Sequence, residues 1–200
     1  SVENILHTEK SIPIAETKPS QTSKELPVFF ESLVEVKKGI KAFSKTMEPV
    51  LLLGETGTGK EYIAQTIHAQ SRQGDRPFIK LNCLFRQKQA IQSQLFKRKD
   101  KDNKTHSTSG KKVVYLSNIE SLSKGLQEKL AEALQNTNLP DTSFEFLPVR
   151  LFISSSKNLD ELAAKGQFHK GLLDVFKETS LLIPPLRNHT ASISLITQDY

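Results

Sequence analysis

The stretch Leu51–Tyr62 reads LLLGETGTGKEY and carries more information about the fold than any other part of the chain. A short apolar run ends at Gly54, and Gly54, Gly59 and Lys60 satisfy the pattern G-x-x-x-x-G-K. In such a loop, glycine lets the backbone bend so that successive N–H groups point at phosphate oxygens, and the lysine reaches the β- and γ-phosphates. The stretch therefore predicts a buried strand, a phosphate-binding loop and a helix, in that order.

The predicted nucleotide site is this loop together with the start of the helix. It consists of Gly54, Glu55, Thr56, Gly57, Thr58, Gly59, Lys60 and Glu61. We expect the ligand to be ATP or ADP, with or without Mg²⁺. The generic motif ends in Ser or Thr, whose hydroxyl ligates magnesium, whereas this chain has Glu61 there, so no metal-ligating residue is predicted. A glycine turn followed by an incidental lysine is the alternative interpretation.

Apolar runs and helical periodicity alternate along the rest of the chain. Helices are predicted over 27–45, 60–70, 84–96, 125–135, 158–166 and 170–178, and strands over 50–53, 78–82, 113–117, 149–154 and 181–183. Five short apolar strands separated by helices predict an α/β fold, with an open and mostly parallel sheet covered on both faces.

Composition indicates one globular domain with polar segments. The chain has 200 residues, of which 36% are hydrophobic and 25% charged, and a formal net charge of +6. That charge permits an acidic partner but does not require one, because surplus lysine on a solvated face is the commoner explanation. Cys83 is alone, which excludes a disulfide framework, and no apolar run approaches membrane-spanning length. Residues 1–25 are predicted to be a flexible linker or arm, in which Ile12 and Ile14 could dock as a short strand, and 97–112 an exposed loop.

Several stretches resemble one family. GETGTGKE (Gly54–Glu61) resembles the GESGTGKE signature of the AAA+ domain of bacterial enhancer-binding proteins, the activators of sigma-54 RNA polymerase. RPFIKLNC (76–83), SLSKGLQEKLAEALQ (121–135), NLDELAAKGQF (158–168) and IPPLR (183–187) are similar to later segments of that family, in the same order. The resemblance implies a P-loop NTPase (AAA+) core in a cytoplasmic bacterial protein, and usually a hexamer subunit that uses ATP to remodel the polymerase.

Departures from the family concern its catalytic residues. Its Walker B strand reads like LFLDEI, in which the aspartate holds the magnesium shell and the glutamate orients the attacking water. This chain has Ser117, which is neutral, and Asn118, which cannot accept a proton, so neither supplies that chemistry. Glu120 is two positions further on and is expected to project differently. Asn82 matches the asparagine that restrains the family's glutamate, so it is expected to lack its partner or to hydrogen-bond a strand end.

Two further family features are replaced. The arginine-finger segment resembles GQFHKGLLDVF (166–176), in which His169 and Val175 occupy the two arginine positions. Losing an arginine finger typically costs orders of magnitude in rate. The GAFTGA loop that grips the sigma factor should follow Phe96, where a shorter lysine-rich loop is found instead. The family's helical lid should begin near Tyr200 and is expected to be absent.

We therefore expect residues 26–200 to be a nucleotide-binding AAA+ domain of a transcription-regulator-like protein, with negligible hydrolysis and no catalytic residues. It is expected to be a monomer or weak oligomer with a protein partner in transcription regulation, and to contact neither a membrane nor DNA directly. Two alternatives remain open at this stage. One is a slow ATPase acting in sigma-54-dependent activation through a displaced base, and the other is an interaction scaffold that binds no nucleotide.

Overall fold

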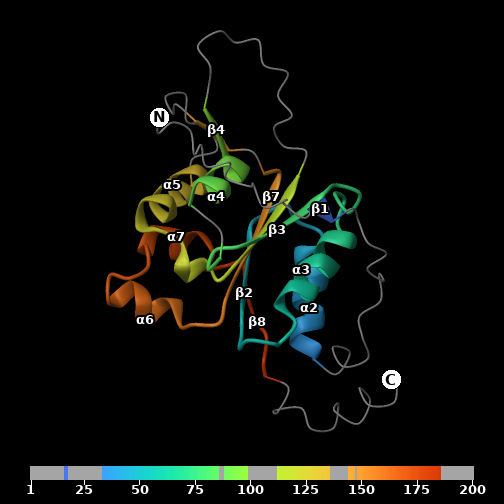
Figure 1. Cartoon of the computed structure of the whole chain (residues 1–200). Coiled ribbons are helices and arrows are strands. Elements are labelled where there is room, and N and C mark those ends of the chain that lie inside the picture. Colours follow the sequence, from blue (N-terminus) through green and yellow to red (C-terminus); the bar gives the residue numbers. More distant parts are fainter. Residues whose placement is uncertain are drawn as a thin grey trace, which may run out of the picture.

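A computed structural model describes residues 16–17, 33–85, 88–98, 112–135, 144–146 and 148–185. Its centre is a six-stranded sheet in the order β1-β3-β5-β7-β2-β8 (Figure 1). The bounds are β1 (Glu16–Thr17), β2 (Val50–Leu53), β3 (Phe78–Asn82), β5 (Val113–Ser117), β7 (Arg150–Ser155) and β8 (Ser180–Leu182). All neighbours from β3 to β8 are parallel, and only β1 runs antiparallel to its neighbour β3. The predicted parallel sheet of five strands is confirmed.

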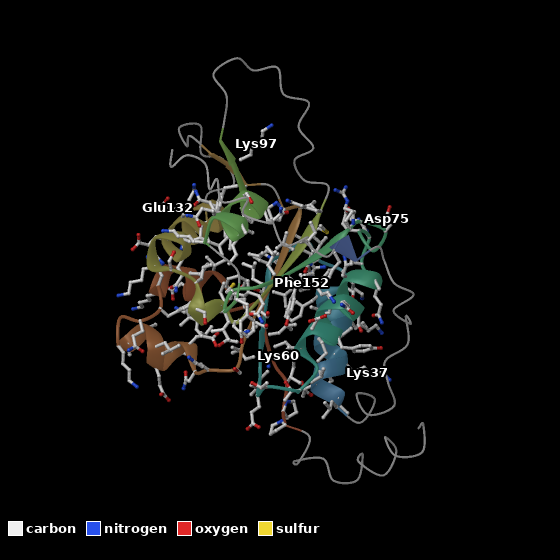
Figure 2. The ribbon with its side chains drawn as sticks, in the orientation of Figure 1. Lys37, Lys60, Asp75, Lys97, Glu132 and Phe152 are labelled. Carbon is white, nitrogen blue, oxygen red and sulfur yellow. The ribbon has the colours of Figure 1, made fainter. Side chains whose placement is uncertain are left out.

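Helices cover both faces of the sheet, as predicted. Figure 1 shows α2 (Val34–Phe43) and α3 (Lys60–Ala69) on one face, and α4 (Lys88–Leu95), α5 (Lys124–Gln135), α6 (Leu159–Ala164) and α7 (Lys170–Val175) on the other. Alternate residues of β2 serve the two faces: Leu51 belongs to the core under α5 and α7, while Val50 and Leu52 pack with α2 and α3. Phe152 of β7 is fully buried near the centre of the sheet (Figure 2). Burial on both faces explains why the strands read as continuous apolar runs.

Two predicted helices begin later than expected. α2 begins at Val34, and the predicted residues 27–32 lie outside the described part of the chain. α4 begins at Lys88 rather than at Leu84. The reason is a turn over Cys83–Phe85, in which the Leu84 N–H donates to Asn82 Oδ1 (3.0 Å). An asparagine that accepts a bond from the backbone two residues on favours a turn over a helix.

A two-stranded antiparallel ribbon was not predicted. β4 (Phe96–Arg98) pairs with β6 (Phe144–Phe146), and the rings of Phe96 and Phe146 lie 5.7 Å apart. The prediction of an exposed loop over 97–112 is therefore wrong at its first two residues, which are strand, while 99–111 lie outside the described residues. The pairing joins segments almost fifty residues apart, so local periodicity carries no trace of it.

The first strand of the described residues, β1, lies at the edge of the six-stranded sheet. β1 lies inside the segment 1–25 predicted as a linker and extends the sheet at β3, because an unpaired strand edge accepts a further strand. Ile12 and Ile14 lie outside the described residues, and the linker remains a prediction for the rest of that segment. Every helix in the described part of the chain is too short or too polar to cross a bilayer.

Candidate nucleotide site

The predicted site residues meet at the carboxyl edge of the parallel strands. Leu53, the last residue of β2, lies opposite Ser155 of β7, and Ser117, the last residue of β5, lies opposite Ser154. Lys60 lies at the same edge, where β2 and β8 end (Figure 2). In open α/β sheets this edge is where ligands bind.

Three glycines shape the loop after β2. Gly54, Gly57 and Gly59 have φ of 154°, 85° and 80°, values that residues with a side chain rarely adopt. A Cβ on Gly54 would lie 2.6 Å from the carbonyl oxygen of Ile183 and 3.0 Å from Thr58 Oγ1, whereas a Cβ on Gly57 would meet nothing within 4 Å. Glycine is therefore required at Gly54 by both space and conformation, and at Gly57 by conformation alone.

Thr58 closes the loop from inside. Its side chain is buried, its Oγ1 donates to the carbonyl of Glu55 (2.8 Å), and its backbone N–H donates to the same carbonyl (3.3 Å). The loop then enters α3 through Gly59, which has no side chain to cap the helix. The first N–H groups of a helix without a side-chain cap remain available to an anion.

Lys60 is held at the loop. Its Nζ donates to the carbonyl oxygens of Gly54 (2.7 Å) and Glu55 (2.6 Å). Burial lowers the pKa of Lys60, and the carboxylate of Glu120 partly offsets this by raising it. The ammonium thus stands beside the backbone that would surround a phosphate, and it interacts electrostatically with a carboxylate from another strand end.

Glu61, which replaces the hydroxyl residue of the generic motif, is turned to a neighbour. Its Oε1 accepts from Lys80 Nζ on β3 (2.9 Å) and from Gln65 Nε2 (3.3 Å). The pair with Lys80 is partly solvent-exposed, so it adds little to stability. The ion pair nevertheless gives the Glu61 carboxylate a cationic partner within the protein.

The turn after β5 forms a contact that the sequence predicts to be lost. Asn118 Nδ2 donates to Asn82 Oδ1 (2.9 Å), so the expectation that Asn82 lacks its partner is wrong. An amide has nearly the size of a carboxylate and can donate to the Asn82 oxygen. Asn118 has φ 55° and ψ 50°, the left-handed conformation that asparagine tolerates best among residues with side chains. The same Asn82 oxygen accepts from the Leu84 N–H, so its expected strand-end role holds as well.

Glu120, which was expected to project away from the positions of the acidic pair, has a carboxylate that acts on the loop lysine. It belongs to the short 3-10 helix η1 (Ile119–Ser121) directly after β5, and its Oε2 is buried without a hydrogen-bond partner. Its carboxylate acts on Lys60 and also on Cys83: burial and, second, Glu120 raise the pKa of the thiol to about 12. Glu120 therefore lies within electrostatic reach of Lys60, after β2, and of Cys83, after β3. Nothing in the local sequence shows this proximity.

The two arginine-finger positions serve the fold. His169 is the N-cap of α7, its Nδ1 accepts from the Leu172 N–H (3.2 Å), and its own N–H donates to Gln127 Oε1 (2.8 Å). Val175 ends α7 and packs partly buried against the core. Neither side chain brings a fixed positive charge. The described residues contain no group of three or more His, Cys, Asp or Glu that could hold a metal ion by itself.

The sheet order, the glycine loop before α3 and the lysine at its start define a P-loop NTPase fold of the AAA+ type. The sigma-54 interaction domain model matches residues 29–181, and the chain belongs to this family. The Nif-specific regulatory protein of Rhodobacter capsulatus is 31% identical over 179 residues, covering 84% of this chain and 31% of that protein. The Nif-specific regulatory protein of Rhizobium leguminosarum bv. trifolii is 32% identical over 181 residues, with 84% and 51% covered. The chain thus spans only a third to a half of these relatives.

Solved structures agree with this fold. NtrX from Brucella abortus in complex with ADP superposes with a TM-score of 0.70 at 21% identity, over 88% of this chain and 41% of NtrX. The P-loop NTPase domain of the sigma-54 transport activator from E. coli superposes with a TM-score of 0.55 at 21% identity, over 78% of this chain and 97% of that domain. At these identities the likeness establishes the fold alone.

Proposed function

We propose that this chain is a nucleotide-binding regulatory domain, spanning 26–200, of a protein that regulates transcription. It binds ATP or ADP at the loop Gly54–Lys60 and hydrolyses it negligibly. The observation that carries this proposal is the contrast between a complete backbone loop and the residues Ser117 and Asn118, where an ATPase of this family needs two carboxylates. The structures of NtrX from Brucella abortus, solved in complex with ADP and with ATP, support the choice of ligand.

The loop fits a phosphate group on the evidence of its own shape. A Cβ at Gly54 would strike the backbone, and Gly57 and Gly59 hold the positive φ values that a phosphate-binding loop of backbone N–H groups requires. We assign phosphate binding to the backbone N–H groups of Gly54–Lys60 and to the ammonium of Lys60. A phosphate would replace the carbonyl partners of Lys60 with a charge-assisted contact, which is the stronger kind.

Turnover needs groups that this chain does not place there. Asn118 donates its amide to Asn82, and an amide is no base at neutral pH. Ser117 carries no charge to hold a magnesium shell. His169 and Val175 offer no guanidinium to the nucleotide of a neighbouring copy, and we accordingly propose a monomer or weak oligomer. Binding would then let the domain sense the nucleotide concentration, or would hold the domain in the conformation that a protein partner in transcription regulation recognises.

Calorimetric titration with ATP and ADP tests the proposal. Wild type should bind saturably, and Lys60→Ala should weaken binding by at least about tenfold, because a contact to a charged group is lost. Lys41→Ala is the matched control, since it removes an exposed lysine in the last turn of α2, which ends beside Arg150 at the opposite edge of the sheet. Absence of saturable binding by wild type at millimolar nucleotide would leave the interaction scaffold as the function.

A further inference from the structure

Glu120 carries a buried carboxylate oxygen that the fold leaves unsatisfied. Oε2 has no hydrogen-bond partner, although the great majority of buried polar atoms in proteins have one. Lys60, the cation on which Glu120 acts, already donates to the carbonyls of Gly54 and Glu55. Glu120 as a whole is half-buried, but leaving this oxygen without a donor is costly, and a buried polar atom of this kind is commonly satisfied by a water molecule or an ion.

The position of this carboxylate makes it unfavourable for nucleotide alone. Glu120 lies in η1, directly after the end of β5, at the edge of the sheet where β2 ends in the loop. Its carboxylate also acts electrostatically on Lys60, so its negative charge lies near the site proposed for phosphates. Two like charges in a partly desolvated crevice repel each other. A divalent cation between carboxylate and phosphate turns this repulsion into attraction.

We propose that Glu120 makes nucleotide binding at the loop Gly54–Lys60 depend on a divalent cation, with its carboxylate taking the place of the metal-holding groups that Glu61 and Ser117 do not supply. This inference rests on the proposed nucleotide binding. Ser117 is neutral, and the Glu61 carboxylate is already engaged by Lys80. Glu120 thus offers a buried carboxylate oxygen that no hydrogen bond within the described residues occupies.

The cation must be one that is coordinated partly by the protein and partly by the nucleotide. Mg²⁺ is usually held by one or two carboxylates together with phosphate oxygens and waters, and not by an all-protein cage. The described residues include no cluster of three or more acidic, histidine or cysteine side chains, which fits this arrangement. Mg²⁺ without nucleotide should therefore not bind measurably.

The test compares ADP affinity with excess Mg²⁺ and with EDTA, by calorimetry, in wild type and Glu120→Gln. Wild type should bind ADP at least about tenfold more tightly with Mg²⁺, as expected for one contact to a charged group. Glu120→Gln should bind with equal affinity, within about twofold, in the two buffers, and more tightly than wild type in EDTA because the repulsion is gone. Glu128→Gln removes the same charge from an exposed position on α5 and should keep the wild-type magnesium effect.

A second variant checks that the effect belongs to charge at the end of β5. Ser117→Asp introduced into the Glu120→Gln chain should restore a magnesium effect, with thermal melting confirming that each variant is folded. Equal wild-type affinity in Mg²⁺ and EDTA overturns the inference whatever the variants do, and so does a Glu120→Gln chain with an undiminished magnesium effect. Absence of wild-type binding in both buffers instead overturns the proposed function, and this inference with it.

Discussion

The loop after β2 and the turn after β5 lie at one edge of one sheet, yet they depend on different parts of the chain. The phosphate contacts proposed for the loop come from backbone N–H groups, and the glycines Gly54, Gly57 and Gly59 give the loop its shape. Turnover by ATPases of this family uses two carboxylates at the turn, where this chain has Ser117 and Asn118. A site of this kind can therefore keep ground-state binding while losing turnover, because the two functions draw on separate atoms.

The turn also shows that shape and chemistry are separable. Asn118 still bonds to Asn82 across β3 and β5, so the geometry of the family's restraint survives in a neutral form. The turn has no carboxylate at 117 or 118, but Glu120, two positions further on, has one whose Oε2 is buried without a hydrogen-bond partner. Three experiments break or sharpen the comparison between loop and turn, and a fourth concerns the far end of α3, from the largest expected effect to the smallest.

The largest effect concerns hydrolysis. Phosphate release by wild type should stay near that of Lys60→Ala, because a water-orienting group typically contributes 10²–10⁴-fold and an arginine finger roughly 10³–10⁵-fold. These factors are not multiplied, since residues that act as a unit are non-additive. Release would be followed with purified protein and saturating ATP. Robust wild-type phosphate release that Lys60→Ala abolishes would show that the domain is a slow ATPase. Glu120 would then be the first candidate for the general base.

Restoring the pair belongs to the same measurement. Ser117→Asp with Asn118→Glu should raise release only modestly, because no arginine stands at 169 or 175. The structure adds a cost: glutamate at the left-handed φ of 55° is strained by about 1–2 kcal/mol and cannot donate to Asn82. A large gain in release would show that the charge pair alone was limiting.

Next in size is a glycine pair within the loop. Gly54→Ala should reduce ADP affinity by at least about tenfold, because its Cβ would lie 2.6 Å from the backbone oxygen of Ile183 and the loop must move. Gly57→Ala meets no atom and pays only for its φ of 85°, about 1 kcal/mol of stability. ADP titration and thermal melting separate the two. Equal losses of affinity would mean that the backbone shape of the loop does not control binding.

A smaller effect is expected at Asn82, on the turn side. Asn82→Ala removes the acceptor used by Asn118 Nδ2 and by the Leu84 N–H, and should lower the free energy of unfolding by about 1 kcal/mol. Asn82→Asp keeps the acceptor and serves as its control. ADP affinity should be unchanged in Asn82→Ala, whereas Asn82→Asp is measured for stability alone because it adds a charge beside Ser117. A parallel fall in affinity would show that loop and turn are coupled, contrary to the comparison.

The smallest effect is a pH dependence at the far end of α3. The pKa of His68 is lowered overall. Burial is the largest cause and Arg150 also lowers it, while the bond to the Arg76 carbonyl and the charge of Asp75 raise it. The folded state therefore resists a proton that the unfolded chain accepts near the ordinary value of 6.5, so stability present above that pH is lost as pH falls below it. His68→Gln should make this slope shallower by up to one proton. Denaturant unfolding between pH 5 and 8 measures it, and an unchanged slope would assign the dependence elsewhere.

Strands and helices whose signal is local could be predicted well. The predicted strands 78–82 and 113–117 coincide with β3 and β5, and the helix predicted from Lys60 begins there. The ribbon of β4 and β6 could not be predicted, because its strands are three residues long and pair across a long separation. The start of α4 shifted for a related reason, since the Asn82 turn overrides the helical pattern.

The sequence by itself determined the loop, because a glycine's φ and a lysine placed at the start of a helix act within a few residues. It also determined that the turn after β5 lacks its acidic pair, since residue identity alone decides charge. Only the tertiary structure decided which side chains share the edge: Asn82 and Asn118 are 36 positions apart and meet because β3 and β5 pair in parallel register. The same packing buries a Glu120 oxygen beside the loop, and burial depends on neighbours from other strands.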